Sequence, residues 1–233
     1  MQGRARALVL SFVAGVIALG GLALGSNMGF QITVPIASGA GVSPKYDNWL
    51  SIPLNNPYPK ANSLCAGLGL VSTGPNASRG VVSRLICSTG VLANYTCGSA
   101  TVGAFALVKG EGVKVRNPVA ISSPLFGSHD PTFAIPLCGD CFTGASPKSE
   151  TWVSVPYHFV GKKADAICND AGLYSGTSCA SVVSRLIPSS GGLANYTCGS
   201  STLGAFTLTV GEAVRIRVNG PAGGVGPWVP SHW

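Results

Sequence analysis

The seven residues ANYTCGS stand at positions 93–99 and recur without a change at 194–200. Just before each copy, the six residues VVSRLI occupy 81–86 and 182–187, again 101 positions apart. Two identical runs at one spacing are the signature of an internal repeat, which decides the fold before any other feature. The chain therefore contains one unit written twice.

The repeat extends outward from these runs to both ends of each copy. The further matching segments are 30–32 with 133–135, 43–45 with 146–148, 49–53 with 152–156, 103–105 with 204–206, 110–111 with 211–212, and 128–129 with 231–232. The spacing is 103 near the ends and 101 in the middle, so the second copy is two residues shorter there. The predicted modules are residues 28–130 and 131–233, each an ordinary domain size able to bury its own core.

Composition favours β structure for both modules. The 233 residues include 32 Gly and 16 Pro, and only 10% are charged, against about 25% in typical soluble domains. Many turns and few exposed helical faces follow from such a composition. The formal net charge is +7, but the basic residues are scattered and the densest cluster is only Lys162-Lys163. A nucleic-acid binder would show a basic stripe, so no nucleic-acid partner is expected.

Hydrophobic spacing places the elements of one module. The predicted elements are a strand at 48–53, a short helix at 60–69, strands at 81–86 and 92–97, and a hairpin of 105–109 with 113–116 around the turn 110–112. One helical face should carry Ala61, Leu64, Cys65 and Leu68, and in the second copy Ala164, Ile167, Cys168 and Ala171. The predicted fold is mainly β, with two tandem homologous small β-sandwich or barrel modules, each holding one short helix.

An apolar segment precedes the modules and predicts an N-terminal apolar helix within residues 1–27. Arg4 and Arg6 are followed by 19 uncharged residues at 7–25, the pattern of a secretory signal. The run ends in small residues before Ser26, as a cleavage site requires, and it is also just long enough to span a bilayer as a retained anchor. In either case the basic residues stay inside, and the modules are expected outside the cytoplasm.

Cysteines in an exported chain are expected to form disulfides. The chain has eight, namely Cys65, Cys87, Cys97, Cys138, Cys141, Cys168, Cys179 and Cys198. Equivalent positions of the two copies suggest Cys65 with Cys97 and Cys168 with Cys198. Each bond would tie the helix to a strand and close a loop of about 30 residues, worth about 3–4 kcal/mol in the chain-entropy picture.

The other four cysteines leave several pairings open, because sequence alone cannot choose among them. Cys138 and Cys141 could close on each other. Cys87 and Cys179, which have no counterpart in the other copy, would then form the remaining pair. An alternative set joins Cys87 to Cys97 and Cys168 to Cys179.

The ordered motifs of each copy resemble a known kind of module. They are Trp-x-Ser-x-Pro, a short helix with Cys, Ser-Arg, Tyr-Thr-Cys-Gly, and Gly-Glu before a basic strand. This pattern resembles tandem β-rich modules of exported bacterial proteins of uncharacterised function, and it covers nearly all of residues 28–233. The resemblance implies an exported β module and no known activity, so it transfers no catalytic residue.

The strongest local motif for chemistry is Cys138-Gly-Asp-Cys141. A redox pair of this spacing needs a helix N-terminus to lower the thiol pKa, but Pro136 precedes it and Gly144 and Pro147 follow it. A zinc site would need a second cysteine pair. The motif therefore favours a structural disulfide, and neither a metal nor a cofactor is expected.

Histidine and glutamate residues offer little more. Ser128-His129-Asp130 is a contiguous triplet, and a catalytic triad is built by convergence in space rather than in sequence, so a turn role is expected for it, and likewise at His232. His158 is isolated. Glu111 and Glu212 are predicted to be turn residues that balance Arg116 or Arg217.

The four tryptophans divide into two groups. Trp49 and Trp152 begin strands and are expected in the core. Trp228 and Trp233 lie in a Gly/Pro-rich end and are expected to form a contact surface.

These patterns favour a non-enzymatic exported structural protein of a bacterial envelope or cell surface. It would be a filament or surface subunit, or a membrane-anchored accessory subunit that stabilises a larger complex from the outer face. The partners would be proteins, with the membrane added through residues 7–25 if that segment is kept. One alternative is a glycan-binding module that uses the aromatic residues, and a weaker one is a redox enzyme that uses Cys138 and Cys141.

Overall fold

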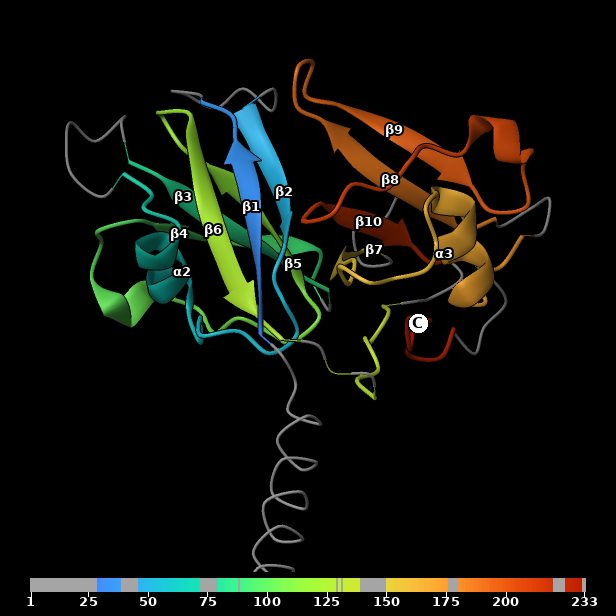
Figure 1. The fold of residues 1–233 in the computed structure, drawn as a ribbon, viewed down its shortest axis with the longest axis horizontal. Helices are drawn as coiled ribbons and strands as arrows, with labels where there is room; N and C mark the ends of the chain where they lie inside the picture. Colours follow the sequence, from blue (N-terminus) through green and yellow to red (C-terminus); the bar gives the residue numbers. More distant parts are fainter. Residues whose placement is uncertain are drawn as a thin grey trace, which may run out of the picture.

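A computed structural model describes residues 29–38, 46–71, 79–87, 89–128, 130, 132–138, 150–175, 180–219 and 225–231. The described protein is mainly β, with three antiparallel sheets and two α-helices (Figure 1). The apolar N-terminal helix predicted within residues 1–27 lies outside the described residues. Within the described ranges, neither helix has the length and apolar character needed to cross a membrane.

Each copy of the repeat forms one four-stranded sheet with the same strand order. In the first copy the order is β2 (Asp47–Ser51), β5 (Gly112–Arg116), β3 (Val81–Ile86) and β4 (Val91–Thr96). In the second copy it is β7 (Glu150–Ser154), β10 (Ala213–Arg217), β8 (Val182–Ile187) and β9 (Gly192–Thr197). The two sheets are built from equivalent segments, so the duplicated sequence produces a duplicated topology.

The first copy carries an additional two-stranded sheet. Strand β1 (Phe30–Ile36) pairs in antiparallel fashion with β6 (Ile121–Gly127), and this pair covers the four-stranded sheet (Figure 1). Val34 and Leu125 from it are buried in the core of the first copy. In the second copy, the described parts of the matching segments meet through a single bridge between Ile135 and Trp228. The two copies therefore differ most in how the open face of their sheet is covered.

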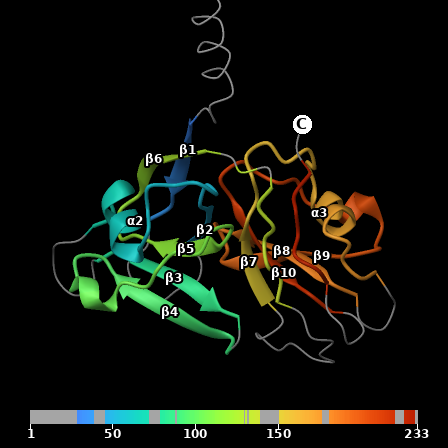
Figure 2. The ribbon, with the colours of Figure 1, turned by 90° about the horizontal axis from the view of Figure 1, so that it is seen from below.

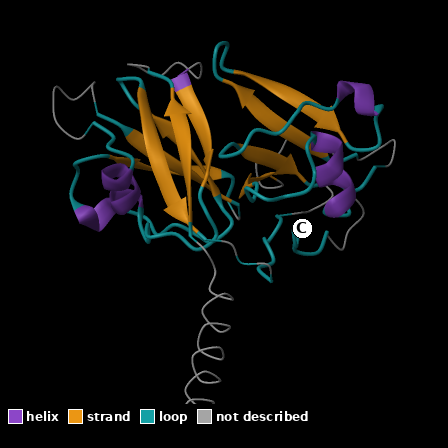
Figure 3. Ribbon diagram, viewed as in Figure 1, coloured by secondary structure: helices purple, strands orange, loops and turns teal. Residues whose placement is uncertain are grey.

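The short helices are α2 (Ala61–Gly67) and α3 (Ala164–Asp170), coloured purple in Figure 3. Their buried residues recur at the helical spacing i, i+3, i+4 predicted from the sequence. They are Ala61, Leu64 and Cys65 in α2, and Ala164, Ile167 and Cys168 in α3. Leu68 and Ala171, just beyond the helices, are also buried. The predicted helix faces are confirmed.

The predicted hairpin at 105–109 is wrong. Strand β5 pairs with β2 on one side and β3 on the other, so no side is left for a third neighbour. The segment instead crosses the start of α2, where Ala61 N–H donates to Phe105 O at 3.0 Å and Leu107 N–H donates to Pro59 O at 3.0 Å. Since the first N–H groups of a helix have no partner within it, this crossing segment satisfies one of them.

Each copy buries its own core, and the two buried clusters share no residue. The first is centred on Val34, Ile36, Leu64, Val82, Val113, Val115 and Leu125. The second is centred on Ile135, Val153, Ile167, Val183, Val214, Ile216 and Trp228. The hydrophobic cores therefore lie within the modules.

Candidate functional site at the junction of the modules

The inner edges of the two sheets meet at the centre of the molecule. Figure 2 shows β2 and β7 close together there, with α2 and α3 toward opposite ends. Ser51 N–H, at the end of β2, donates to Gly211 O of the second copy at 2.9 Å. Ser154 N–H, at the end of β7, donates to Gly110 O of the first copy at 2.9 Å. Each inner edge is therefore closed by a turn of the other module.

The Ser154 hydroxyl forms a second link across the junction. It accepts a hydrogen bond from Ile52 N–H at 2.7 Å and donates one to Glu111 O at 2.7 Å. The Ser154 side chain thus connects two backbone groups of the first module. Because Ser154 is buried, both backbone groups would lose their partner if the hydroxyl were removed.

Ser51 makes the equivalent bonds in the opposite direction. Its hydroxyl accepts from Val155 N–H at 2.9 Å and donates to Glu212 O at 2.6 Å. The two serines occupy the same position of the repeat, so the junction has a local twofold symmetry. Such a self-complementary contact is the geometry of a symmetric dimer, formed here within one chain.

Packing on this local axis is tight. The rings of Trp49 and Trp152 lie with centroids 5.4 Å apart, so these residues contact each other across the junction. Trp152 is buried, as expected, whereas Trp49 is only half-buried, and neither is part of the two core clusters. A Cβ added at Gly112 would lie 2.6 Å from Cβ of Ala213. Glycine is therefore required at position 112 by the close approach of the second module.

Glu111 stabilises the turn of the first module that bonds to the second module. Its carboxylate pairs with Arg84 at 3.2 Å and accepts from Val108 N–H at 3.1 Å. Burial raises the pKa of Glu111 to about 7, although Arg84 and the Val108 N–H act in the opposite direction. The carboxylate and the arginine together orient the turn whose carbonyls reach Ser154.

Glu212 repeats this arrangement with Arg185 at 3.8 Å, and burial again raises its pKa. The predicted partners of the two glutamates, Arg116 and Arg217, are therefore wrong. Arg116 and Arg217 pair instead with acidic residues of the neighbouring strands β2 and β7.

Arg116 and Arg217 belong to two other equivalent clusters. Asp47 pairs with Arg116 at 2.6 Å and with Lys114 at 3.3 Å. Glu150 likewise pairs with Arg217 and Arg215. Each cluster therefore links the inner-edge strand to its neighbouring strand by ion pairs.

A disulfide also crosses the junction. Cys87, after β3, is bonded to Cys138 of the second copy, with Cα atoms 6.1 Å apart. The predicted closure of Cys138 on Cys141 is therefore wrong, as are the pairings of Cys87 with Cys179 or Cys97. Cys141 and Cys179 themselves lie outside the described residues. The physical reason is that the junction brings β3 and the start of the second module together, which sequence spacing does not show.

The other two disulfides join the equivalent positions suggested by the repeat. They connect Cys65 with Cys97 and Cys168 with Cys198, at Cα separations of 5.7 and 5.6 Å. The alternative bond between Cys168 and Cys179 is excluded by this pairing. Three disulfides are typical of a protein in an oxidising environment.

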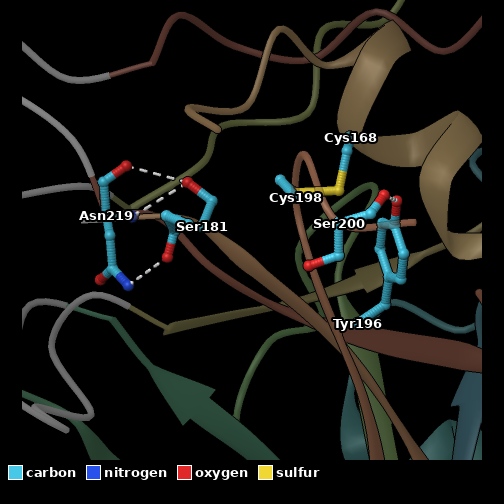
Figure 4. The surroundings of a disulfide bond; sticks show 7 residues. Cys168, Ser181, Tyr196, Cys198, Ser200 and Asn219 are labelled. Carbon is cyan, nitrogen blue, oxygen red and sulfur yellow. Dashed lines mark hydrogen bonds between the residues drawn. A yellow bond between two sulfur atoms is a disulfide. The ribbon is translucent and has the colours of Figure 1, made fainter. Parts of the chain in front are cut away.

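Hydrogen bonds surround the second of these disulfides (Figure 4). Cys198 N–H donates to Ser181 O at 2.8 Å, and the Ser181 hydroxyl donates to Asn219 O at 2.9 Å. The Tyr196 hydroxyl donates to Ser200 O at 2.8 Å. The tyrosine and cysteine side chains of the repeated ANYTCGS run, and the backbone carbonyl of its last serine, thus each have a structural role.

Two equivalent hollows flank the junction. One, of about 130 Å³, lies beside Arg84, Glu111 and Trp152, and the Cys87–Cys138 bond lines it. The other, of about 200 Å³, lies beside Arg185, Glu212 and Trp49. At the positions of the two cysteines the second hollow has Pro188 and Pro35. The duplication therefore produced two similar hollows, of which only one contains a disulfide.

The expectation that Trp228 lies on a contact surface is wrong. Trp228 is 1% exposed, it packs in the core of the second module, and its indole N–H donates to Asp170 at 2.6 Å. Its position matches Leu125 of the first module, so it fills the space that β6 covers there. Trp233, the other residue expected on that surface, lies outside the described residues.

Asp130 has a structural role in the link between the modules. It forms an ion pair with Lys109 and accepts from the Thr132 hydroxyl at 2.9 Å. These bonds, led by the one from Lys109, lower the pKa of Asp130 to about 2. His129 and His232 lie outside the described residues, while His158 is buried next to Tyr157.

Sequence analysis missed two exposed apolar side chains at equivalent positions. Val102 and Leu203 lie in short 3₁₀-helices, η3 (Thr101–Gly103) and η5 (Thr202–Gly204), and are 97% and 96% exposed. An alignment of the two copies shows that both residues are apolar, but it does not show that they are exposed.

The described residues contain no group of three or more His, Cys, Asp or Glu side chains placed to hold a metal ion. Comparison of the chain with protein-family models, with curated proteins and with solved structures finds no match.

Proposed function

We propose that this chain is a non-enzymatic, exported structural subunit of a cell envelope or surface, which acts by binding protein partners. In this proposal, residues 28–130 and 131–233 are two small sandwich-like modules that work as one rigid body outside the cytoplasm. The segment 7–25 directs export and either is removed or anchors the protein in the membrane.

The junction carries this proposal. Reciprocal serine bonds, backbone bonds in both directions and the Cys87–Cys138 disulfide all connect the two modules. A flexible pair of domains would instead be joined by a small polar contact and a linker. A rigid body with two equivalent halves presents each outer surface twice and at a fixed separation, which suits a repeating assembly.

The three disulfides support the exported location, because such bonds form and persist outside the reducing cytoplasm. The low share of charged residues, 10%, also suits a protein whose surface is covered by partners.

The test is cross-linking and native mass measurement on the protein isolated, without reduction, from its own membrane or surface fraction. We expect cross-linked species that contain this chain together with itself or another protein, and three or more intact disulfides. A clean monomer at high concentration, with no cross-linked partner in that fraction, would refute the proposal. A measured mass that begins at Met1 would identify a membrane-anchored subunit, and one that begins near Ser26 a released subunit.

Glycan binding is the alternative from a different class. It depends on exposed aromatic rings, and the burial of Trp228 removes one of the two residues expected to supply them. An array of glycans would separate the two proposals, because specific binding would favour the alternative.

A further inference from the structure

Strands β4 and β9 form the outer edges of the two four-stranded sheets. Each pairs with one neighbour, β3 or β8, and no other described strand pairs with its second side. Figures 1 and 2 both show β4 and β9 on opposite sides of the molecule. The molecule therefore presents two equivalent strand edges that face away from each other.

The inner edges are closed in a different way. There, Ser51 N–H and Ser154 N–H each donate to a carbonyl of the other module. The protein thus already closes one pair of sheet edges with turns from the other copy of its repeat. The outer edges, at the other side of each sheet, have no such partner among the described residues.

The two outer strands lack charged residues and proline, which are two of the usual protections against strand pairing. Natural sheets protect their edges with charged residues or proline. Proline occurs in both strands of the two-stranded sheet, as Pro35 and Pro124, whereas β4 (VLANYT) and β9 (GLANYT) contain neither proline nor a charged residue. A strand side that no described strand pairs with can accept a further strand through its backbone groups.

The two outer edges also match each other. Residues 92–96 and 193–197 share the sequence LANYT. When these strands are centred on each other in antiparallel register, Asn94 lies opposite Asn195 and no like charges meet. Both asparagines are exposed, and no structural bond of the described protein explains why they were retained in both copies.

We propose that the partner of each outer edge is a second copy of this chain, bound by antiparallel pairing of β4 with the β9 of the next molecule. One sheet of the first molecule then continues into one sheet of the second as eight strands. Because each molecule has two such edges on opposite sides, pairing does not close and produces a filament. This inference rests on the proposed structural function and names its partner.

The test uses the full-length chain in mild detergent, studied by sedimentation velocity and electron microscopy. The key variant is Asn94→Lys with Asn195→Lys, which places a charge in each edge and opposes like charges across the pair. We expect the wild type to form species that grow with concentration, and the double variant to remain a monomer. Since every contact joins a β4 to a β9, either single variant places a lysine in all of them and should also remain a monomer. An equal mixture of the two single variants keeps one unchanged pair of edges and should stop at dimers.

Two controls accompany these variants. Asn94→Gln with Asn195→Gln changes the same positions without adding charge and should assemble as the wild type does. Val102→Lys with Leu203→Lys adds the same charges at exposed positions outside the edges and should also assemble. An unchanged non-reduced disulfide pattern and circular dichroism spectrum establish that each variant is folded.

Several results would overturn the inference. They are a monomeric wild type, assembly of the double lysine variant, or loss of assembly in the Val102 and Leu203 control. If the native surface fraction then yields cross-links to a different protein, the structural function stands and only the second copy as partner is rejected. If it yields no cross-links, both proposals fail.

Discussion

The two modules share one strand order, but the face of the four-stranded sheet is covered differently in each. In the first, β1 and β6 form a second sheet over the core, whereas the described residues of the second show at these positions only the Ile135–Trp228 bridge. Trp228 stands where the first module has Leu125, so one large side chain compensates for the absent strand pairs. The comparison shows that the four-stranded sheet and helix are the constant part of the repeat, and that its cover can be replaced.

Trp228→Ala tests this comparison with the largest expected effect. We expect it to lower the free energy of unfolding by about 3–5 kcal/mol, because a buried ring is lost. Asp170 would also lose the indole N–H as a donor. Chemical denaturation followed by circular dichroism measures the change. Leu125→Ala, expected at about 2–5 kcal/mol, is the matched variant, and a smaller loss at Trp228 than at Leu125 would contradict the proposed compensation.

Removal of the two equivalent disulfides should affect both modules alike. The pairs Cys65–Cys97 and Cys168–Cys198 close loops with sequence separations of 32 and 30 residues. Each double alanine variant should therefore lose about 3–4 kcal/mol in the chain-entropy picture. Denaturation of the two variants side by side gives the comparison. If the two losses in free energy of unfolding differ by more than about 1 kcal/mol, the size of the closed loop does not decide how much each disulfide stabilises its module. The different coverage of the two sheets would then be the cause.

The junction serines should also respond alike. Ser51→Ala and Ser154→Ala each leave two backbone groups without a partner at a buried site, so each should lower the free energy of unfolding by about 1–3 kcal/mol. Thermal or chemical unfolding measures the loss. Ser200→Ala, at an exposed position, is the control and should stay within about 0.5 kcal/mol. If neither junction variant differs from this control, the hydroxyl bridges do not stabilise the junction.

The smallest expected effect is a pH dependence of stability from Glu111. Its folded pKa of about 7 lies above the ordinary 4.5, so between these values the folded state holds a proton that the unfolded state has released. The free energy of unfolding should therefore fall as the pH rises from 4.5 to 7 and level off above 7. Denaturation at several pH values should show a smaller slope for Glu111→Gln than for the wild type.

Glu212→Gln provides the comparison between the modules. Burial raises the pKa of Glu212 as well, so this substitution should reduce the slope in the same direction. A stability that rises with pH over this range in the wild type, and equally in both variants, would show that neither glutamate is protonated in the folded protein.

Features that depend on nearby residues could be predicted from the sequence. The buried faces of α2 and α3 follow from helical spacing, and the segments of β3 and β8 follow from short apolar runs between turns. The residues 105–109 look like a strand by the same rule. They became a crossing segment because β5 had no free side, which is a property of the whole sheet.

The candidate site could not be predicted in the same way, because each of its contacts joins distant residues. Ser51 and Ser154 are one repeat length apart, and only the packing of one module on the other brings each to the backbone of its neighbour. Trp228 is buried because it fills the space that β6 covers in the first module. The Gly/Pro-rich sequence around it, on which the prediction of a contact surface rested, does not show this.

The sequence by itself determined the duplication, the mainly β character and the helix faces, because these depend on composition and on spacings of a few residues. It also supplied the equivalent cysteine positions. Only the tertiary structure decided the Cys87–Cys138 bond, the partners of Glu111 and Glu212, and which strand edges are left open. These features depend on how the two folded modules pack against each other. Their contacts join residues that are distant in the sequence and come together only once each module has folded.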